Sequence, residues 1–317
     1  MAERPEQLFT GYWRYLAVRA ACKLDLFEHI AAGVRTVPGL CAAISCDQRS
    51  LDSLVGALVH EEYLLHSEEG LRLSLEAQRL CAGHPTSVKH ACLLWGAEHM
   101  DAWQHLDESI RSGQPVFTKL FGDTFFRYLD GHPERAVEYH RAMFEYARQD
   151  YAGIGEVLDL SAHRSVMDVG GGNGALVGCL RAGHPGVSFR IFDIQDHRTD
   201  HSRDILFIQG DFFNAVPEGS DALLLSRVIH DWDDAQALQI LRNCHSALPR
   251  EGALFLIEND LSMLADGGHL LSLNMLATCG SRERSVQEYQ QLLEGSGFRV
   301  QGLVHHGNQA IIKTVRA

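Results

Sequence analysis

Beyond Ser165, short hydrophobic runs alternate with longer segments in which hydrophobic residues recur at helical spacing. Short apolar runs bounded by glycine and polar residues are typical of buried strands, and apolar residues three and four positions apart are typical of helices that pack on one side. The pattern predicts strands at Val166–Val169, Phe189–Phe192, Leu206–Gln209, Ala222–Leu225 and Leu254–Ile257, and helices at Ala175–Ala182, Ala235–Leu248 and Val286–Gly295.

The chain closes with two further strand-like segments, Arg299–His305 and Gln309–Val315, which are near enough in sequence to form an antiparallel hairpin. Strands that alternate with helices form a mostly parallel sheet with helices on both faces. We therefore expect an α/β fold: a Rossmann-like, doubly wound, mostly parallel sheet with an antiparallel last strand.

The first third of the chain is helical and poor in strands. Thr36, followed by Pro38, marks a helix start, because a threonine side chain can cap the first turn and proline suits that turn. Helix, turn, helix and hairpin in this order predict a winged-helix domain. The expected helices are Leu8–Lys23, Leu26–Ala32, Leu40–Ile44 and Ser50–Glu61, and the expected hairpin strands are Tyr63–His66 and Leu71–Ser74.

Winged helices often bind DNA, so the charge of the second helix matters. Arg49 and His60 are offset there by Asp52, Glu61 and Glu62, and the whole chain has a formal net charge of −13. Phosphate backbones and anionic membranes require clustered lysine and arginine. The sequence therefore predicts a structural or dimerising domain, with neither nucleic acid nor a membrane as partner.

A chain of 317 residues is long for a single core, which favours more than one domain. Residues 87–160 are again helical, with breaks at Gly113-Gln114-Pro115 and Gly131-His132-Pro133. We expect a winged-helix domain over residues 1–86, a helical linker over residues 87–160 and a ligand-binding domain over residues 161–317.

The eight cysteines are scattered, with neither a Cys-x-x-Cys pair nor zinc-site spacing. Thiols of this kind are ordinary in a reducing compartment. The N-terminus has no basic segment followed by an apolar one, and no apolar run reaches the roughly 18 residues of a membrane helix. These features predict a cytoplasmic protein.

The first predicted strand of the sheet runs into the sequence Asp168-Val-Gly-Gly-Gly-Asn-Gly174. Glycines at Gly170 and Gly172 let a ligand approach the bare backbone, and the helix that follows directs free N–H groups at it. The spacing Gly-x-Gly-x-x-Ala is compatible with NAD and is a weak signal by itself. Asp193, at the end of the second strand, is placed to accept hydrogen bonds from ribose hydroxyls.

Three later strand ends disfavour NAD. Asp211 and Phe212 follow the third strand, His230-Asp231-Trp232 follows the fourth, and Glu258 ends the fifth. An acid, an aromatic ring and a histidine around one glycine turn suit an adenosyl ligand that carries a reactive group beside a base.

Together these motifs resemble the class I S-adenosylmethionine-dependent O-methyltransferases, in the family of plant caffeate and bacterial polyketide or phenazine enzymes. The resemblance covers nearly the whole chain, because the winged-helix third matches that family's dimerisation domain. It implies a homodimer that uses S-adenosyl-L-methionine, releases S-adenosyl-L-homocysteine and needs no metal. The matching segments are Asp168–Gly174, Phe192-Asp193, Gly210-Asp211-Phe212, His230-Asp231-Trp232 and Arg282-Glu283-Arg284.

The resemblance also implies residue roles. The cofactor would be bound by Asp168, Gly170, Gly172, Asp193, Asp211, Phe212, Ser226, Arg227 and Trp232. His230 would be the general base, with Glu258 and Glu283 flanking its ring and holding it. By position relative to family pockets, the acceptor would contact Trp103, Met143, Phe144, Asn274 and Met275.

Methyl transfer from a sulfonium is an in-line displacement, so positioning and a base for the acceptor hydroxyl are what the protein must supply. His230 could instead belong to a loop that caps the next helix, but Asp233 followed by Gln236 already forms a capping pair. We expect O-methylation of a small aromatic secondary metabolite. An N-methyltransferase acting on a heteroaromatic ring, or a winged-helix regulator that senses S-adenosylmethionine, remain the alternatives.

Overall fold

The computed structural model describes residues 5–198 and 202–317, and these residues form two compact units. Unit 1 consists of residues 1–100 and 134–146, and unit 2 consists of residues 101–133 and 147–317. Helices α7 (Glu98–Gln104) and α11 (Pro133–Asp150) each run from one unit into the other. Thr199–His201, between β4 and β5, lie outside the described residues.

Unit 1 contains the helix, turn, helix and hairpin that the sequence predicts. Thr36 caps α3, accepting a hydrogen bond from the backbone N–H of Gly39 at 3.3 Å. Helix α4 begins earlier than predicted, because Asp47 caps it through the N–H of Ser50 at 2.8 Å. The elements are α1 (Pro5–Lys23), α2 (Leu26–Ala31), α3 (Val37–Ile44), α4 (Gln48–His60), β1 (Leu64–Ser67), β2 (Gly70–Leu73), α5 (Leu75–Gln78) and α6 (Lys89–Trp95).

Unit 2 is built on a seven-stranded sheet in the order β5-β4-β3-β6-β7-β9-β8. Strands β3 to β7 pair in parallel, whereas β9 pairs antiparallel with both β7 and β8. The predicted fold class, including the antiparallel last strand, is confirmed. The strands are β3 (Ser165–Val169), β4 (Ser188–Asp193), β5 (Leu206–Gln209), β6 (Ala222–Ser226), β7 (Ala253–Asn259), β8 (Phe298–His306) and β9 (Gln309–Arg316).

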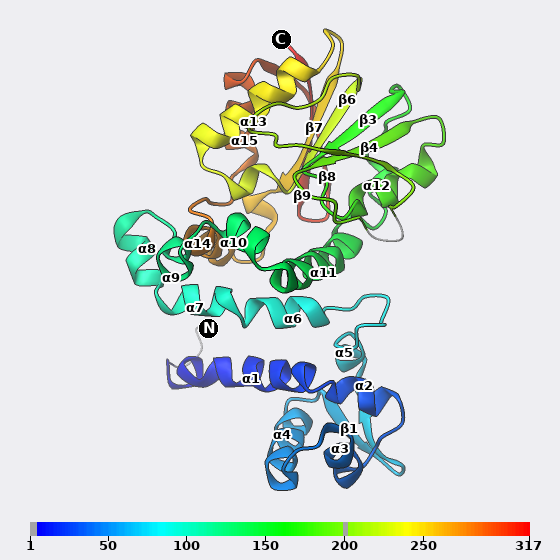
Figure 1. The fold of residues 1–317 in the computed structure, drawn as a ribbon, viewed down its shortest axis with the longest axis vertical. Coiled ribbons are helices and arrows are strands. Elements are labelled where there is room, and N and C mark those ends of the chain that lie inside the picture. The colour runs from blue at the N-terminus through cyan, green and yellow to red at the C-terminus, as the bar shows by residue number, and fades with distance from the viewer. Residues whose placement is uncertain (1–4, 199–201) are drawn as a thin grey trace. The chain divides into compact units, whose positions relative to one another are not determined.

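Helices cover both faces of this sheet, with α13 and α15 on one side and α12 on the other (Figure 1). Met167 and Leu223 join one hydrophobic core, and their neighbours Val166 and Leu224 join the other, since successive strand residues point to opposite faces. The helices of this unit are α8 (Leu106–Ser112), α9 (Val116–Phe121), α10 (Phe125–Gly131), α12 (Ala175–Leu180), α13 (Asp234–Ala247), α14 (His269–Thr278) and α15 (Val286–Gly295), with 3-10 turns η1 (Ile154–Glu156), η2 (Arg181–Gly183), η3 (Ile229–Asp231) and η4 (Leu261–Met263).

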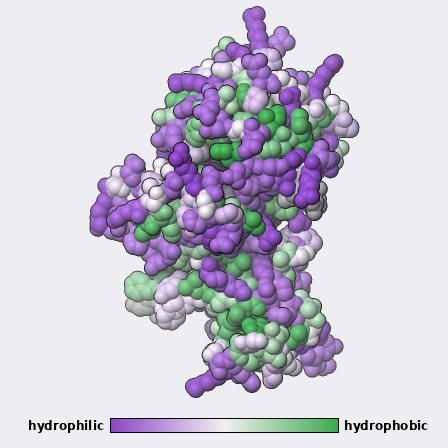
Figure 2. Space-filling view, viewed as in Figure 1, coloured by the Kyte–Doolittle hydropathy of each residue, from purple (hydrophilic) through white to green (hydrophobic). Residues whose placement is uncertain are grey.

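The remaining features are the polarity of the surface, the character of the helices and the state of the cysteine thiols. Hydrophilic side chains occupy most of the face seen in Figure 2, interrupted by hydrophobic patches. Within the described residues, no helix combines the length and the apolar character that crossing a membrane requires. All eight cysteines are free thiols.

Candidate active site

The residues that the sequence singles out end neighbouring strands of the sheet. Asp168 lies on β3, Asp193 ends β4, Ser226 ends β6 and Glu258 lies near the end of β7. Because β4, β3, β6 and β7 are consecutive and parallel, their carboxyl ends meet at one edge of the sheet. A crevice at this edge is the usual ligand site of doubly wound folds.

The glycine-rich turn after β3 adopts a backbone that side chains rarely tolerate. Gly170, Gly172 and Gly174 have φ values of 72°, 52° and 79°. A Cβ on Gly170 would come within 2.8 Å of Val228, whereas a Cβ on Gly172 would meet nothing within 4 Å. Val228 therefore packs against the turn at Gly170. The space beside Gly172 is open, so a ligand can approach the bare backbone there.

Two aspartates support this turn. Asp193 accepts hydrogen bonds from the backbone N–H groups of Gly172 at 2.8 Å and Ile194 at 2.7 Å. Asp168 is buried, and a Cβ on Gly171 would lie 2.8 Å from its Oδ2, so its carboxyl group packs directly against the turn. Burial, together with the negative charge of Asp193, raises the pKa of Asp168 to about 7. A positively charged ligand at this edge would stabilise its ionised form.

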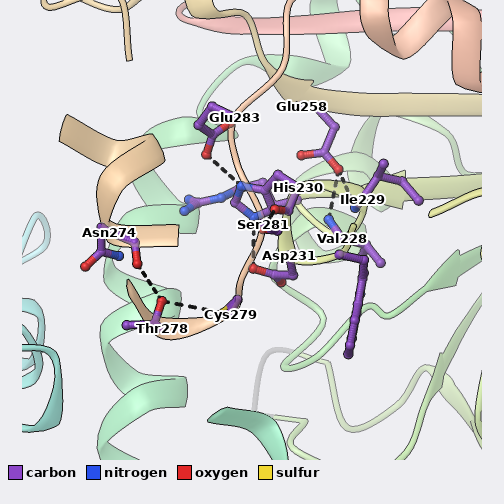
Figure 3. Close-up of polar contacts among 12 residues, drawn as sticks. Val228, Ile229, His230, Asp231, Glu258, Asn274, Thr278, Cys279, Ser281 and Glu283 are labelled. Atoms are coloured by element: carbon purple, nitrogen blue, oxygen red, sulfur yellow. Dashed lines mark hydrogen bonds and ion pairs between the residues drawn. The ribbon is translucent and has the colours of Figure 1, made fainter. Parts of the chain in front are cut away.

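His230 lies in the 3-10 turn η3 after β6, with a carboxylate near each ring nitrogen (Figure 3). Its Nδ1 is 2.8 Å from Oε1 of Glu283, and its Nε2 is 3.6 Å from Oδ1 of Asp231. Burial alone lowers the pKa of His230, but the negative charges of Asp231, Glu283 and Glu258 outweigh it and raise the pKa to about 10. The acidic neighbours therefore favour the protonated form of the ring.

Glu258 does not hold the histidine ring, contrary to its predicted role. Its Oε1 accepts hydrogen bonds from the backbone N–H groups of Val228 at 3.0 Å and Ile229 at 2.7 Å (Figure 3). Of the two predicted glutamates, Glu283 bonds the ring and Glu258 fixes the backbone of the turn that carries it. Sequence reasoning could place both acids near His230 but not assign their hydrogen bonds, which depend on side-chain direction.

The His230 turn is also held from the segment after α14. Arg284 is fully buried and donates hydrogen bonds to the carbonyl oxygens of Ile229 at 3.0 Å and Trp232 at 2.7 Å. The hydroxyl of Ser281 donates to the carbonyl of His230 itself. Backbone bonds on both sides of the histidine therefore fix its position.

Asp231 is a site residue to which the sequence analysis assigned no role. Its side chain is largely buried beside Nε2 of His230, and burial raises its pKa to about 6, although the positive charge of His230 opposes this shift. The sequence feature that could have identified Asp231 is its position next to His230, the proposed general base. A carboxylate here can accept a proton or a hydrogen bond close to Nε2 of His230.

Aromatic rings gather at the predicted adenine side. The Trp232 ring packs edge-on against Phe213 at 4.6 Å and against Phe212 at 6.0 Å, measured between ring centroids. Asp211 accepts hydrogen bonds from the N–H of Phe213 at 2.8 Å and the side chain of Asn214 at 3.1 Å, so its oxygens help to shape the loop. The structure thus brings Asp211, Phe212 and Trp232 to one end of the sheet edge.

Ser226 and Arg227 are tied to the end of α11. The Ser226 hydroxyl lies 2.7 Å from the hydroxyl of Tyr151, and Arg227 donates a hydrogen bond to Asp150 at 2.6 Å. Arg227 has a left-handed φ of 54°, a strained conformation for a residue with a side chain. Tyr151 and Asp150 were not predicted, because nothing local in the sequence relates them to a strand end far along the chain.

The predicted acceptor residues fall into two groups. In unit 2, Trp103 donates a hydrogen bond from Nε1 to Oδ1 of Asn274 at 2.9 Å, and Asn274 and Met275 are buried on α14. Met143 and Phe144 lie on the part of α11 that belongs to unit 1, and their role stays a prediction. No group of three or more His, Cys, Asp or Glu side chains able to hold a metal occurs among the residues that the structure describes.

The comparisons with known proteins agree with this arrangement. A family model described as an O-methyltransferase domain matches residues 103–299. A 3-amino-4-hydroxybenzoate 4-O-methyltransferase from Streptomyces cremeus is 32% identical over 310 residues, covering 93% of this chain and 84% of that protein. A phenazine-1-carboxylate N-methyltransferase from Pseudomonas aeruginosa is 28% identical and covers 94% of this chain and 92% of its own length.

A solved structure shows the same fold. It is an O-methyltransferase from neocarzinostatin biosynthesis in complex with S-adenosyl-L-homocysteine and 1,4-dihydroxy-2-naphthoic acid, 28% identical, with a TM-score of 0.81 over 96% of each chain. The family match spans more than half of the chain, and the relatives align over most of their length. The sequence-based assignment to the methyltransferases is confirmed, and the chain belongs to the O-methyltransferase family.

Proposed function

We propose that the protein transfers a methyl group from S-adenosyl-L-methionine to a hydroxyl of a small aromatic molecule, with His230 as the general base. The observation that carries this proposal is the position of His230, bonded to Glu283 and adjacent to Asp231, at the sheet edge that also holds the glycine-rich turn. A base and an open backbone cradle at one crevice are what a methyl transfer to a weakly acidic hydroxyl needs.

The residues at this edge fit an adenosyl sulfonium ligand. Gly172 offers open backbone, Asp193 can accept hydrogen bonds from ribose hydroxyls, and the aromatic rings around Trp232 can border an adenine. Asp168 and Asp231 both have raised pKa values, so their ionised forms gain from a cation nearby. When bound, S-adenosyl-L-methionine supplies an electrophilic methyl group on a positively charged sulfur.

His230 supplies the base. Its Nδ1–H donates to Glu283, which fixes the tautomer in which Nε2 is the free basic nitrogen. A sulfonium bound nearby would disfavour the imidazolium and so lower the pKa of His230. Neutral Nε2 would take the proton of the acceptor hydroxyl as the methyl group passes from sulfur to that oxygen and S-adenosyl-L-homocysteine leaves, and Glu283 would stabilise the resulting imidazolium.

An aromatic acceptor needs an apolar site with a few polar groups, and Trp103, Asn274 and Met275 are the residues of unit 2 proposed for it. Asn274 and Met275 are buried on α14. Nε1 of Trp103 donates a hydrogen bond to Oδ1 of Asn274 and so orients the amide. An N-methyltransferase is the second candidate. The identity to a phenazine-1-carboxylate N-methyltransferase favours it, because such an acceptor nitrogen also needs positioning beside the methyl group.

A homodimer fits the surface of unit 1. Leu8, Phe9, Tyr12 and Trp13 of α1 are all more than half exposed, and they form an apolar face on one helix. A second copy of this chain is the occupant we assign to that face, because the winged-helix domain lacks the basic surface that DNA would require. The resemblance to the dimerisation domain of this family supports the same assignment.

Two measurements test the function. Calorimetry with S-adenosyl-L-homocysteine measures cofactor binding directly, and no binding would refute the proposal. Incubation with a methyl-labelled donor and a set of aromatic hydroxyl and amine compounds, read by mass spectrometry, identifies the acceptor. Labelled ether products support O-methylation, and labelled amines with no ethers support the second candidate.

A gel-shift assay at physiological salt tests the regulator alternative, which requires specific DNA binding.

A further inference from the structure

Helix α10 contacts the loops that follow two different strands of the sheet. The ring of Phe126 packs against Trp232, in the loop after β6, with centroids 5.6 Å apart and planes tilted by 31°. Oδ1 of Asp130 accepts a hydrogen bond from Nε2 of Gln195, in the loop after β4, at 2.8 Å. Both partners come from the carboxyl edge where the candidate site lies.

The order of strands determines what lies beneath α10. Strand β3 is between β4 and β6, so the two loops that α10 contacts stand on either side of the glycine-rich turn after β3. The two contacts therefore tie α10 to loops that flank the carboxyl end of β3, where that turn begins. The loops on the two sides also contain Asp193 and His230, the residues proposed for ribose binding and for proton transfer.

The rest of the segment anchors α10 on its other side. Phe125 and Leu129 are buried, and the Phe125 ring lies edge-on to Phe117 of α9 at 5.3 Å. Gly122, between α9 and α10, has a φ of 83°, and a Cβ there would meet nothing within 4 Å. Firm packing holds α10 to α9, and Gly122 joins the two helices through a left-handed turn with open space around it.

These two contacts are more exposed than the packing on α9, and Asp130 also lies close enough to His197 to influence its charge. Phe126 is only partly buried, and the Gln195–Asp130 hydrogen bond is exposed to solvent. Exposed hydrogen bonds exchange readily with water, so this bond can open at little cost. The arrangement combines a stable hinge side with two contacts that separate easily.

We propose that α10 is a strap that closes the cofactor crevice and must lift before the cofactor can enter or leave. Phe126 against Trp232 and Asp130 against Gln195 are its two latches. This inference rests on the proposed function, since the ligand that passes beneath the strap is the adenosyl cofactor. The strap therefore controls the rates of cofactor exchange, whereas the residues below it control affinity.

Stopped-flow tryptophan fluorescence with S-adenosyl-L-homocysteine measures both rate constants, and calorimetry measures the dissociation constant. Phe126→Ala and Gln195→Ala each remove one latch. We expect each variant to raise the association and dissociation rate constants together by about fivefold or more, with the dissociation constant changed by less than about threefold. Gln195→Ala changes a loop side chain only and keeps the test valid if Phe126→Ala unfolds.

Arg127→Ala is the matched control, because Arg127 lies on α10 with an exposed side chain. Its rate constants should equal those of the unmodified protein. Unchanged rate constants in both latch variants would overturn the proposal. An increase in the dissociation rate constant alone would also overturn it, because Phe126 would then be an ordinary ligand contact. Failure of the unmodified protein to bind S-adenosyl-L-homocysteine refutes the proposed function instead, so the two failures are distinguishable.

Discussion

Nδ1 of His230 lies 2.8 Å from Oε1 of Glu283, and both side chains are buried. The two residues are 53 positions apart, on the turn after β6 and on the segment between α14 and α15. This pair fixes the ring so that Nε2 lies 3.6 Å from Oδ1 of Asp231. The pair is the basis of the first two predictions.

We expect His230→Ala to lower kcat by about 10² to 10⁴, the usual contribution of a general base. Cofactor binding should persist, because the glycine-rich turn and Asp193 do not depend on the imidazole. Steady-state kinetics and calorimetry with S-adenosyl-L-homocysteine measure the two effects separately. A variant with unchanged kcat would show that His230 is not the base.

Glu283→Gln should shift the pH dependence of kcat. The negative charges of Asp231 and Glu283 raise the pKa of His230, so replacing Glu283 by a neutral residue lowers it. Because the neutral ring is the active form, kcat rises with pH as His230 loses its proton, and this rise should move to lower pH in the variant. The plateau should also fall, since the imidazolium loses its stabilising charge.

Kinetics from pH 5 to pH 10 with saturating cofactor check this shift. Glu294→Gln, an exposed change on α15, is the control and should leave the profile in place. If kcat rises over the same pH range in Glu283→Gln as in the unmodified protein, the ionisation that controls kcat is not that of His230.

Glu258→Gln should make stability less dependent on pH. Burial raises the pKa of Glu258 from 4.5 to about 7 in the folded protein, and its Oε2 has no hydrogen-bond partner among the described residues. The folded state therefore keeps a proton that the unfolded chain loses, and the free energy of unfolding falls as pH rises through this window. The amide oxygen of glutamine can still accept from Val228 and Ile229, without carrying a charge.

Relative to the unmodified protein, the variant should gain about 2 kcal/mol in the free energy of unfolding between pH 5 and pH 8. Urea unfolding at the two pH values measures the gain. An equal difference at both values would mean that Glu258 titrates alike in the folded and unfolded states.

Asp193→Asn should weaken binding of S-adenosyl-L-homocysteine by about 10- to 100-fold, because hydrogen bonds to a charged acceptor contribute more than those to a neutral one. The asparagine oxygen can still accept from Gly172, whereas its amide nitrogen cannot accept from Ile194, so one of the two bonds to the backbone is kept. Calorimetry measures the dissociation constant, and Asp204→Asn, an exposed acid paired with Arg181, is the control. Equal affinity in Asp193→Asn would remove Asp193 from the cofactor site.

The exposed apolar face of α1 should form the dimer interface. Phe9→Glu with Trp13→Glu places charges where the side chains are 68% and 61% exposed, so the fold should persist while self-association is lost. Light scattering after size-exclusion chromatography gives the mass. Leu75→Glu, at a side chain 80% exposed elsewhere in unit 1, should stay dimeric. A double variant that remains dimeric would place the interface on another surface.

Local pattern was enough for most of the sheet domain. Each predicted strand lies within or coincides with an observed one, and α15 was predicted with its observed bounds, because the capping box of Ser285 and Glu288 and the helical spacing are local features. Helix α14 was not predicted as a helix. Its apolar residues are spread around the helix rather than along one face, so it lacks the spacing that marks an amphipathic helix.

The site divides in the same way. The sequence by itself determined which residues stand at strand ends, namely the glycine-rich turn, Asp193, His230 and Glu258, since strand periodicity and chain order are sufficient to bring them to one edge. Only the tertiary structure decided that Glu283 bonds the His230 ring while Glu258 bonds the backbone. Those bonds depend on the directions of side chains from distant segments, which are set by packing and which no local pattern encodes.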